Sequence, residues 1–250
     1  MRNAQSGSVL AKKLQKFIPL TPNEQRRLAD IQSDPLTVKR GQRLTAEGQT
    51  GHKVFVLHSG WACSHKDLAD GQRQVISFPI AGDCVGMRSA LLRTADHSFS
   101  ALTDAMVTSV DAADIMQCVT DFPRLGMALF WAASRDEAMI VEHLVSVGRR
   151  SGVERMAHFF LELAERLRLI GVAAQTEFRC PLTQFVLADA LGMTAIHVNR
   201  VLRELRELGL LTIRNGSVRM YDVDRLKKLA GFQGDYLDMP GESSSALRRL

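Results

Sequence analysis

The stretch Cys180–Tyr221 constrains the fold of this chain more tightly than any other part of the sequence. Within it, Thr183 can cap a short helix that Gly192 closes in a left-handed conformation. Thr194 can cap a second, longer helix that ends at Gly209. The second helix has one apolar face, whose members follow helical spacing: Val198, Val201, Leu202, Leu205 and Leu208. A helix, a glycine turn and a longer helix together predict a helix-turn-helix.

A hairpin is expected directly after the second helix. Its strands are Leu210–Ile213 and Ser217–Tyr221, and Arg214-Asn215-Gly216 lies between them. The pair Asn-Gly favours the two-residue turns that join antiparallel strands. The sequence therefore predicts a β-wing beside the helix-turn-helix.

The outward face of the second helix carries arginine and amide side chains. An α-helix fits the major groove of DNA, where arginine can donate two hydrogen bonds to guanine and an amide can pair with adenine. We expect Arg200 and Asn199 to reach bases, and Arg203, Arg206 and Arg214 to contact phosphates. A solvated helix with ordinary surface arginines is the alternative, but the caps, the turn and the wing together favour DNA. The candidate DNA-binding residues are Thr183, Thr194, Ile196, His197, Asn199, Arg200, Arg203, Arg206 and Arg214.

The basic charge of the chain is concentrated in this C-terminal part. The formal net charge is +5. Residues 1–147 contain 16 basic and 15 acidic side chains, whereas residues 148–228 contain 14 and 9. A localised basic region fits a polyanionic partner.

The N-terminal part has a different texture. Leu10–Ile31 reads as a short helix that Pro19 and Pro22 break near its middle. Short apolar alternations between turn residues then continue to about Val119, which favours an antiparallel barrel or jelly roll. The expected strands are Leu36–Val38, Arg43–Thr45, Lys53–His58, Trp61–Lys66, Gln72–Phe78, Cys84–Val85, His97–Ala101 and Ala105–Asp111.

Two helices are expected between the barrel and the helix-turn-helix, over Phe122–Val147 and Val153–Leu169. The first has a long apolar stripe. This stripe can pack against the chain's own barrel, or it can pair with the same helix of a second subunit and be buried symmetrically. We expect a homodimer, with the candidate dimerisation residues Leu125, Leu129, Ala132, Ile140, Leu144 and Val147.

Composition excludes several classes of protein. Hydrophobic residues make up 46% of the chain and charged residues 24%, which is typical of a globular protein. No apolar run is long enough to span a membrane, and the N-terminus lacks the apolar core of a signal peptide, so we expect a cytoplasmic protein with no membrane partner. No paired nucleophile and base, phosphate loop or metal-binding box is present, so we do not expect an enzyme.

The cysteines and histidines offer few candidate sites. Cysteines occur at Cys63, Cys84, Cys118 and Cys180 without any Cys-x-x-Cys pair, which argues against zinc or an iron–sulfur cluster held by thiolates. Cys180 is a candidate redox site, because its neighbour Arg179 can favour the thiolate, although a buried inert cysteine is the simpler interpretation. We expect no metal and no cofactor. A haem is the alternative, and the histidines that could ligate it are His52, His58, His65 and His97.

The sequence is similar to the Crp/Fnr superfamily of bacterial transcription regulators from about Leu10 to Tyr236. His197-Val198-Asn199-Arg200 and Pro181-Leu182-Thr183-Gln184 resemble the FixK-type branch. Gly82-Asp83-Cys84-Val85-Gly86 resembles the family's sensor roll.

The resemblance implies an α+β fold with an N-terminal β-roll, a double-stranded β-helix like that of cyclic-nucleotide-binding domains. The implied divisions are residues 1–120 for the roll with its N-terminal helix, 121–148 for a dimerisation helix, 149–232 for a winged helix-turn-helix, and 233–250 for a flexible tail. It also implies a homodimeric activator on a palindromic site in double-stranded promoter DNA that contacts RNA polymerase. A sensor module of the cyclic-nucleotide or haem type that regulates a protein partner is the alternative.

Departures from the family pattern concern the effector and the bases that are read. Gly86 is followed by Met87 and Arg88, so the carboxylate that holds ribose in members that bind cyclic AMP is missing. His97-Ser98 replaces their Arg-Ser pair, so we expect no binding of cyclic AMP. In relatives, the position that matches Arg200 reads a guanine, whereas a glutamate commonly stands where this chain has Ile196. We expect Ile196 to touch a thymine methyl instead.

Overall fold

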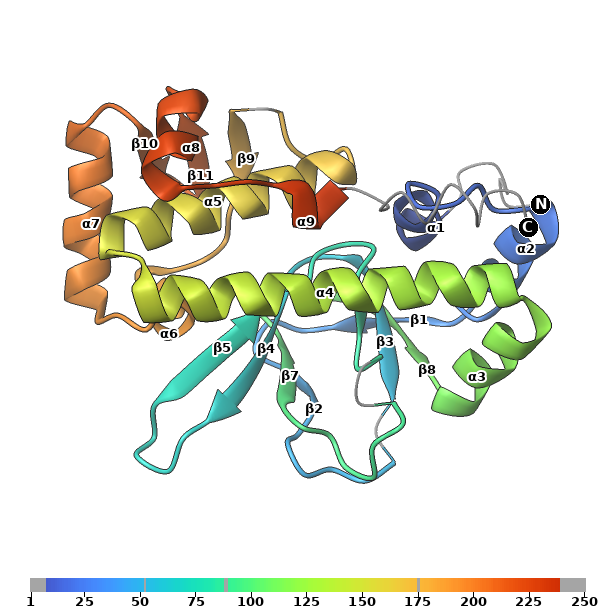
Figure 1. Ribbon diagram of the computed structural model, residues 1–250. Helices are drawn as coiled ribbons and strands as arrows, with labels where there is room; N and C mark the ends of the chain where they lie inside the picture. Colours follow the sequence, from blue (N-terminus) through green and yellow to red (C-terminus); the bar gives the residue numbers. More distant parts are fainter. Residues whose placement is uncertain (1–7, 52, 88–89, 175, 239–250) are drawn as a thin grey trace. The chain divides into compact units, whose positions relative to one another are not determined.

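The computed structural model describes residues 8–51, 53–87, 90–174 and 176–238 (Figure 1). These residues form two compact units. The first contains residues up to 64 together with 78–136, and the second contains 65–77 together with 137–238. We describe each unit by itself.

Two helices open the first unit. Helix α1 (Val9–Leu14) is capped by the Ser8 side chain, and α2 (Pro22–Asp30) begins with a capping box made by Thr21 and Glu24. The predicted break near the middle of this segment is confirmed, since no helix is present among the described residues between Leu14 and Pro22. Proline fits the first turn of a helix because its missing N–H has no intrahelical partner there, so Pro22 begins α2 instead of breaking it.

Two four-stranded sheets follow, in the orders β1-β8-β3-β6 and β2-β7-β4-β5. The strands pair in antiparallel orientation, as in β1 with β8, β2 with β7, and β3 with both β6 and β8. All eight predicted strands are confirmed, with ends displaced by a residue or two: β1 Pro35–Val38, β2 Arg43–Thr45, β3 Val54–Ser59, β4 Ala62–Asp67, β5 Arg73–Ser77, β6 Cys84–Val85, β7 Ser98–Ala101 and β8 Ala105–Val110. Phe55 and Phe99 pack within the roll, with ring centroids 5.6 Å apart.

Gly60 allows the close approach of the turn between β3 and β4 to β8. Its φ is +87°, and a Cβ at this position would lie 2.6 Å from the carbonyl oxygen of Asp104. Only glycine satisfies both conditions without a shift of the backbone.

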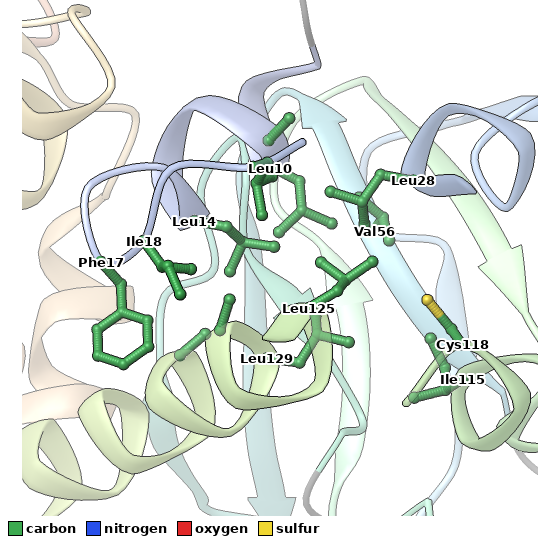
Figure 2. Packing of buried hydrophobic residues seen from close by; sticks show 14 of the residues in the cluster. Leu10, Leu14, Phe17, Ile18, Leu28, Val56, Ile115, Cys118, Leu125 and Leu129 are labelled. Carbon is green, nitrogen blue, oxygen red and sulfur yellow. The ribbon is translucent and has the colours of Figure 1, made fainter. Parts of the chain in front are cut away.

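The core of the first unit joins its helices to the roll. Helix α3 (Ala112–Asp121), which was not predicted, leads into α4 (Pro123–Arg149). Figure 2 shows Leu125 and Leu129 of α4 packed toward Leu10, Leu14 and Ile18 of the N-terminal segment. The first half of α4 is therefore part of this core.

The buried face of α4 corrects half of the predicted dimer interface. Leu125, Leu129 and Ala132 are 0%, 2% and 7% exposed within a single chain. They pack against the chain's own core, so they have almost no surface left for a second subunit. The alternative interpretation, packing on the barrel, holds for these three residues.

The second unit is built around α5 (Gly152–Leu169), which starts with a capping box made by Ser151 and Glu154. It continues with the three-stranded antiparallel sheet β10-β11-β9 and four shorter helices. Three of its elements were not predicted, namely β9 Glu177–Arg179, α8 Val223–Ala230 and α9 Asp235–Asp238.

The start of the predicted flexible tail, residues 233–250, is ordered. Leu237 of α9 is 1% exposed, and the Tyr236 hydroxyl donates a hydrogen bond to the Glu162 carboxylate at 2.9 Å. Burial and this bond fix the segment as far as residue 238. The rest of the predicted tail, 239–250, lies outside the described residues.

Candidate DNA-binding surface

The predicted helix-turn-helix is confirmed by α6 (Gln184–Leu191) and α7 (Ala195–Glu207). The Thr183 hydroxyl accepts a hydrogen bond from the Val186 N–H at 3.3 Å, and the Thr194 hydroxyl accepts one from the His197 N–H at 3.2 Å. Gly192 ends α6 with φ +60°. The two helices are bent by 99° at this break, within the range of helix-turn-helix motifs.

The two faces of α7 are separated by polarity. Val198, Val201 and Leu205 are at most 2% exposed and hold the helix against the unit. The opposite face is exposed to solvent, and it carries Ile196, Asn199, Arg200, Arg203 and Arg206. These exposed side chains therefore remain the candidates for the base and phosphate contacts.

His197 lies apart from that exposed face. A Cβ added to Gly152 would approach the His197 Nε2 to 2.8 Å, so the ring packs against the first residue of α5. The side chain is half-buried. The ring of His197 is therefore directed toward α5 and not along the exposed face of α7.

Gln184 and Phe185 of α6 also belong to this surface, and neither was among the predicted DNA-binding residues. The Asn199 amide Nδ2 donates a hydrogen bond to the Gln184 Oε1 at 3.4 Å, which places the first turn of α6 beside the exposed face of α7. Phe185, the next residue, is 74% exposed. The sequence does contain a signal for Phe185, namely a large apolar side chain two residues after the helix N-cap Thr183.

The wing has the predicted turn. Strands β10 (Leu211–Arg214) and β11 (Ser217–Met220) pair with Arg214 opposite Ser217, and Asn215-Gly216 forms the loop. Asn215 has φ +50° and Gly216 has φ +69°, as a type I′ turn requires. Arg214 at the base of this turn is exposed.

Cys180 does not have the environment of a redox site. The residue is 2% exposed, and burial raises the pKa of its thiol to about 11, against which a hydrogen bond from the Leu182 backbone acts only weakly. The neighbouring Arg179 does not supply the expected stabilisation of a thiolate, since its guanidinium donates a hydrogen bond to the Asn215 carbonyl at 3.0 Å. The simpler interpretation, a buried cysteine, fits the structure.

A buried charged cluster lies where α4 meets α5. The Nε2 of His143 on α4 is 3.0 Å from the Oε1 of Glu162 on α5, whose other oxygen accepts the Tyr236 hydrogen bond. The Nδ1 of the same imidazole is 3.2 Å from the Ile76 carbonyl oxygen. This cluster joins α4, α5, β5 and the C-terminal segment within the second unit.

Electrostatics in the cluster favour a charged pair. Burial raises the pKa of the Glu162 carboxyl, but the charge and hydrogen bond of His143, with Arg166 and Tyr236, lower it further, to about 2. Burial lowers the pKa of His143, and Glu162 together with the Ile76 carbonyl more than reverses this, so the pKa of His143 is raised. His158 differs, because burial and the charge of Arg150 lower its pKa to about 4.

The second half of α4 presents an apolar face to solvent. Leu144 is 72% exposed, Val141 54% and Val147 42%, whereas Ile140 is half-buried. Among the exposed apolar residues of the helix, Met127 and Phe130 are three residues apart, and so are Val141 and Leu144. The second pair follows the first by fourteen residues, which is two heptads, and Val145 lies beside it.

The interior of the roll leaves little space. A cavity of about 10 Å³, enough for about one water molecule, is lined by residues that include Lys53, Phe55, Gly86, His97 and Phe99. The rings of Phe55 and Phe99, which both line it, have their centroids 5.6 Å apart. Arg88 lies outside the described residues.

The candidate haem ligands are engaged with protein partners where the structure describes them. The His58 Nε2 is 2.7 Å from the Thr108 hydroxyl, and the His97 Nδ1 is 2.7 Å from an Asp96 oxygen. His65 is 2% exposed, and His52 lies outside the described residues. Within the described part of the chain, no three His, Cys, Asp or Glu side chains gather as a metal site would require.

By length and apolar composition, no single helix among the described residues could cross a membrane; only α6 and α7, taken together as a bent pair, pass that test.

Comparisons with known proteins identify the family. Residues 35–121 match the cyclic nucleotide-binding domain, and residues 154–229 match the Crp-like helix-turn-helix domain. The nitrogen fixation regulation protein FixK of Bradyrhizobium diazoefficiens is 32% identical over 192 residues, which are 76% of this chain and 79% of that protein. The chain belongs to the Crp/Fnr family of transcription regulators.

Other Crp/Fnr relatives extend the match. The anaerobic regulatory protein of Haemophilus influenzae is 26% identical over 220 residues, covering 87% of this chain and 85% of the relative. The solved structure of FixK2 from Bradyrhizobium japonicum has a TM-score of 0.72 at 22% identity, covering 80% of this chain and 98% of that one, which supports the fold. The resemblance to the FixK-type branch and the α+β fold with a winged helix-turn-helix are confirmed.

Proposed function

We propose that this Crp/Fnr regulator acts as a homodimer that binds palindromic promoter DNA and contacts RNA polymerase. The observation that carries the proposal is the exposed face of α7, where Asn199, Arg200 and Arg203 stand out to solvent on a helix whose other face is buried. Because its proposed target is promoter DNA, we propose that the protein is cytoplasmic and that its role is regulatory and not enzymatic.

The surface proposed for dimerisation is the outer face of α4, and not its inner one. It consists of Met127, Phe130, Val141, Leu144 and Val145, with Val147 at its edge. Exposed apolar side chains in a heptad-like pattern gain stability when a second copy covers them. Pairing two copies of one helix would set two recognition helices about 34 Å apart, the length of one turn of DNA.

The proposed division of the chain is 1–120 for the sensor roll, 121–148 for the dimerisation helix and 149–232 for DNA binding. We propose for the base and phosphate contacts Ile196, Asn199, Arg200, Arg203, Arg206 and Arg214, with Thr183 and Thr194 at the N-termini of the two helices. Backbone N–H groups at such termini bind phosphates readily.

Selection of bound fragments from a random DNA pool tests this function. We expect a two-fold symmetric consensus from the full-length protein, and a sedimentation coefficient of a dimer at micromolar concentration. Binding to all sequences alike, or a monomer that binds no DNA, contradicts the proposal. Retention of a protein partner with no enrichment of DNA would favour a sensor module that regulates a protein.

A further inference from the structure

The helix-turn-helix exposes two large apolar side chains in equivalent places. Among the described residues of the second unit, Ile196 and Phe185 are the most exposed large apolar side chains, at 85% and 74%. Each is the second residue of its helix, and each follows a threonine N-cap by two positions. From the sequence, Ile196 is expected to contact a thymine methyl group, whereas no role is predicted for Phe185.

The surroundings of Phe185 are those of a surface that meets DNA. Its neighbour Gln184 accepts the hydrogen bond from Asn199, so the first turn of α6 lies next to the face of α7 that carries Arg200. The Thr183 cap leaves other backbone N–H groups of that first turn available to a phosphate. An exposed phenyl ring in the same helical turn as free N–H groups suits a polyanion with apolar groups in its groove.

We propose that Phe185 is a specificity-determining residue that packs on the 5-methyl group of a thymine in the half-site, distinct from the thymine read by Ile196. The inference rests on the proposed function. The thymine methyl is the one apolar group that a base pair presents in the major groove, and phenylalanine is among the side chains that contact it. Phe185 thus adds a second apolar contact to the hydrogen bonds made by Arg200.

Removal of single methyl groups from the DNA tests the contact directly. The consensus is first selected with the wild-type protein, and each thymine is then replaced in turn by deoxyuridine, which differs only by that methyl. We expect the wild-type affinity to fall on the order of threefold at one position that depends on Phe185, as for the loss of one buried methyl group. Phe185→Ala should remove the sensitivity at this position alone, and Phe185→Leu should retain part of it.

Two matched variants control for general effects. Ile196→Ala should remove the sensitivity at a different thymine, and Val172→Ala, which alters another exposed apolar side chain at 63%, should leave every position unchanged. Melting temperatures and salt slopes should match the wild type for all of them, because none of these side chains is buried.

The outcomes separate this inference from the function on which it rests. A symmetric consensus with no uracil effect that depends on Phe185 overturns the inference and leaves DNA regulation standing. Equal weakening of all sequences by Phe185→Ala also overturns it, since the ring would then pack on the sugar–phosphate backbone. If no consensus is selected at all, both the inference and the proposed function fail.

Discussion

Arg73 and Asp189 are 116 positions apart in the sequence and form an ion pair within the second unit. The Arg73 Nε and Nη2 lie 3.1 Å and 2.7 Å from the same Asp189 oxygen, Oδ2. The next residue on β5, Gln74, donates a hydrogen bond from Nε2 to the Ala190 carbonyl at 3.2 Å. Strand β5 is therefore fastened to the first helix of the helix-turn-helix by two side chains.

The first prediction concerns this attachment. Arg73→Ala should accelerate amide hydrogen exchange in α6 with a loss of about 1 kcal/mol, because both partners are partly exposed and such pairs stabilise weakly. Asp189→Asn should produce the same effect, and the double variant should add little to either. Lys66→Ala, at an exposed site on the neighbouring strand, serves as control. Unchanged amide exchange in α6 would show that the Gln74 hydrogen bond and side-chain packing are enough to hold β5 against α6.

The second prediction concerns the pH dependence of stability. The pKa of His143 is raised in the folded state, so its protonated form stabilises the protein. That stability is fully present below about pH 6.5, the ordinary pKa of histidine, and it is lost as the pH rises through the folded pKa of His143. His143→Gln should therefore be less stable than the wild type at pH 6, by about 3 kcal/mol, with a smaller difference at pH 9.

Denaturant unfolding of both proteins across this range measures the difference. The pKa of the wild-type Glu162 carboxyl, about 2, lies below this range. In His143→Gln the pKa of this buried carboxyl rises, because the charge and the hydrogen bond of His143 that lower it are lost. The lowered pKa of His158, about 4, makes the folded state less stable as the pH falls below the ordinary histidine value. This effect occurs in both proteins and is smaller in the variant, because the charge of His143 is one of the causes that lower the pKa of His158. A difference that is constant with pH would mean that His143 acts only through packing.

The third prediction concerns assembly. Leu144→Asp should convert the dimer to a monomer in sedimentation and abolish binding to the palindromic site, because it places a charge in an apolar interface. It should leave the melting temperature of the monomeric fold nearly unchanged, since Leu144 is 72% exposed. Val172→Asp, at an exposed apolar position away from α4, should remain dimeric. A wild-type monomer at micromolar concentration would refute the dimer.

The fourth prediction separates two arginines of α7. Arg200→Ala should cost about 1–3 kcal/mol and relax the preference at one base pair, because a bidentate contact to guanine is lost. Arg206→Ala should weaken all sequences alike and reduce the salt dependence. We expect the half-site to keep its guanine and to differ beside it from the TGTGA and TTGAT patterns of relatives. Equal weakening of every sequence by Arg200→Ala would make this residue a phosphate contact.

The fifth prediction concerns the effector. Calorimetry should detect no binding of cyclic AMP at physiological concentrations. The pattern lacks the ribose carboxylate after Gly86, and the cavity beside Gly86 and His97 has room for about one water molecule. A buried phosphate costs several kcal/mol unless a cation pairs with it, and Lys53, which lines the cavity, is already paired with Asp111. Micromolar affinity would contradict the interpretation of Met87 and His97.

Local signals made the strands of the roll and the helix-turn-helix predictable. Thr183, Gly192 and the Asn215-Gly216 turn each specify the conformation of their own neighbourhood, and the structure confirms all three. Strand β9 was missed because its three residues are defined by pairing with β11, as in Ser217 opposite Arg179, and nothing local marks them.

The dimer face was mispredicted for a different reason. Periodicity identifies the apolar positions of a helix but not what covers them, and α4 is apolar on two faces. Leu129 lies on the inner face and Phe130 on the outer. Only the tertiary packing, in which Leu129 joins the core of the first unit, shows which face is buried. The pairing of His143 with Glu162 likewise depends on the tertiary structure, since the spacing of these residues predicts no contact within one helix.

Helix α4 runs without interruption for 27 residues, with Leu125 and Leu129 on its core face near the start and Leu144 on its outer face near the end. Each residue of an α-helix advances the chain by about 100° around the axis. One alanine inserted after Ser134 would therefore turn Leu144 by that angle about the helix axis relative to Leu125 and Leu129. The number of residues between Leu129 and Leu144 thus decides in which direction around α4 its exposed apolar face points.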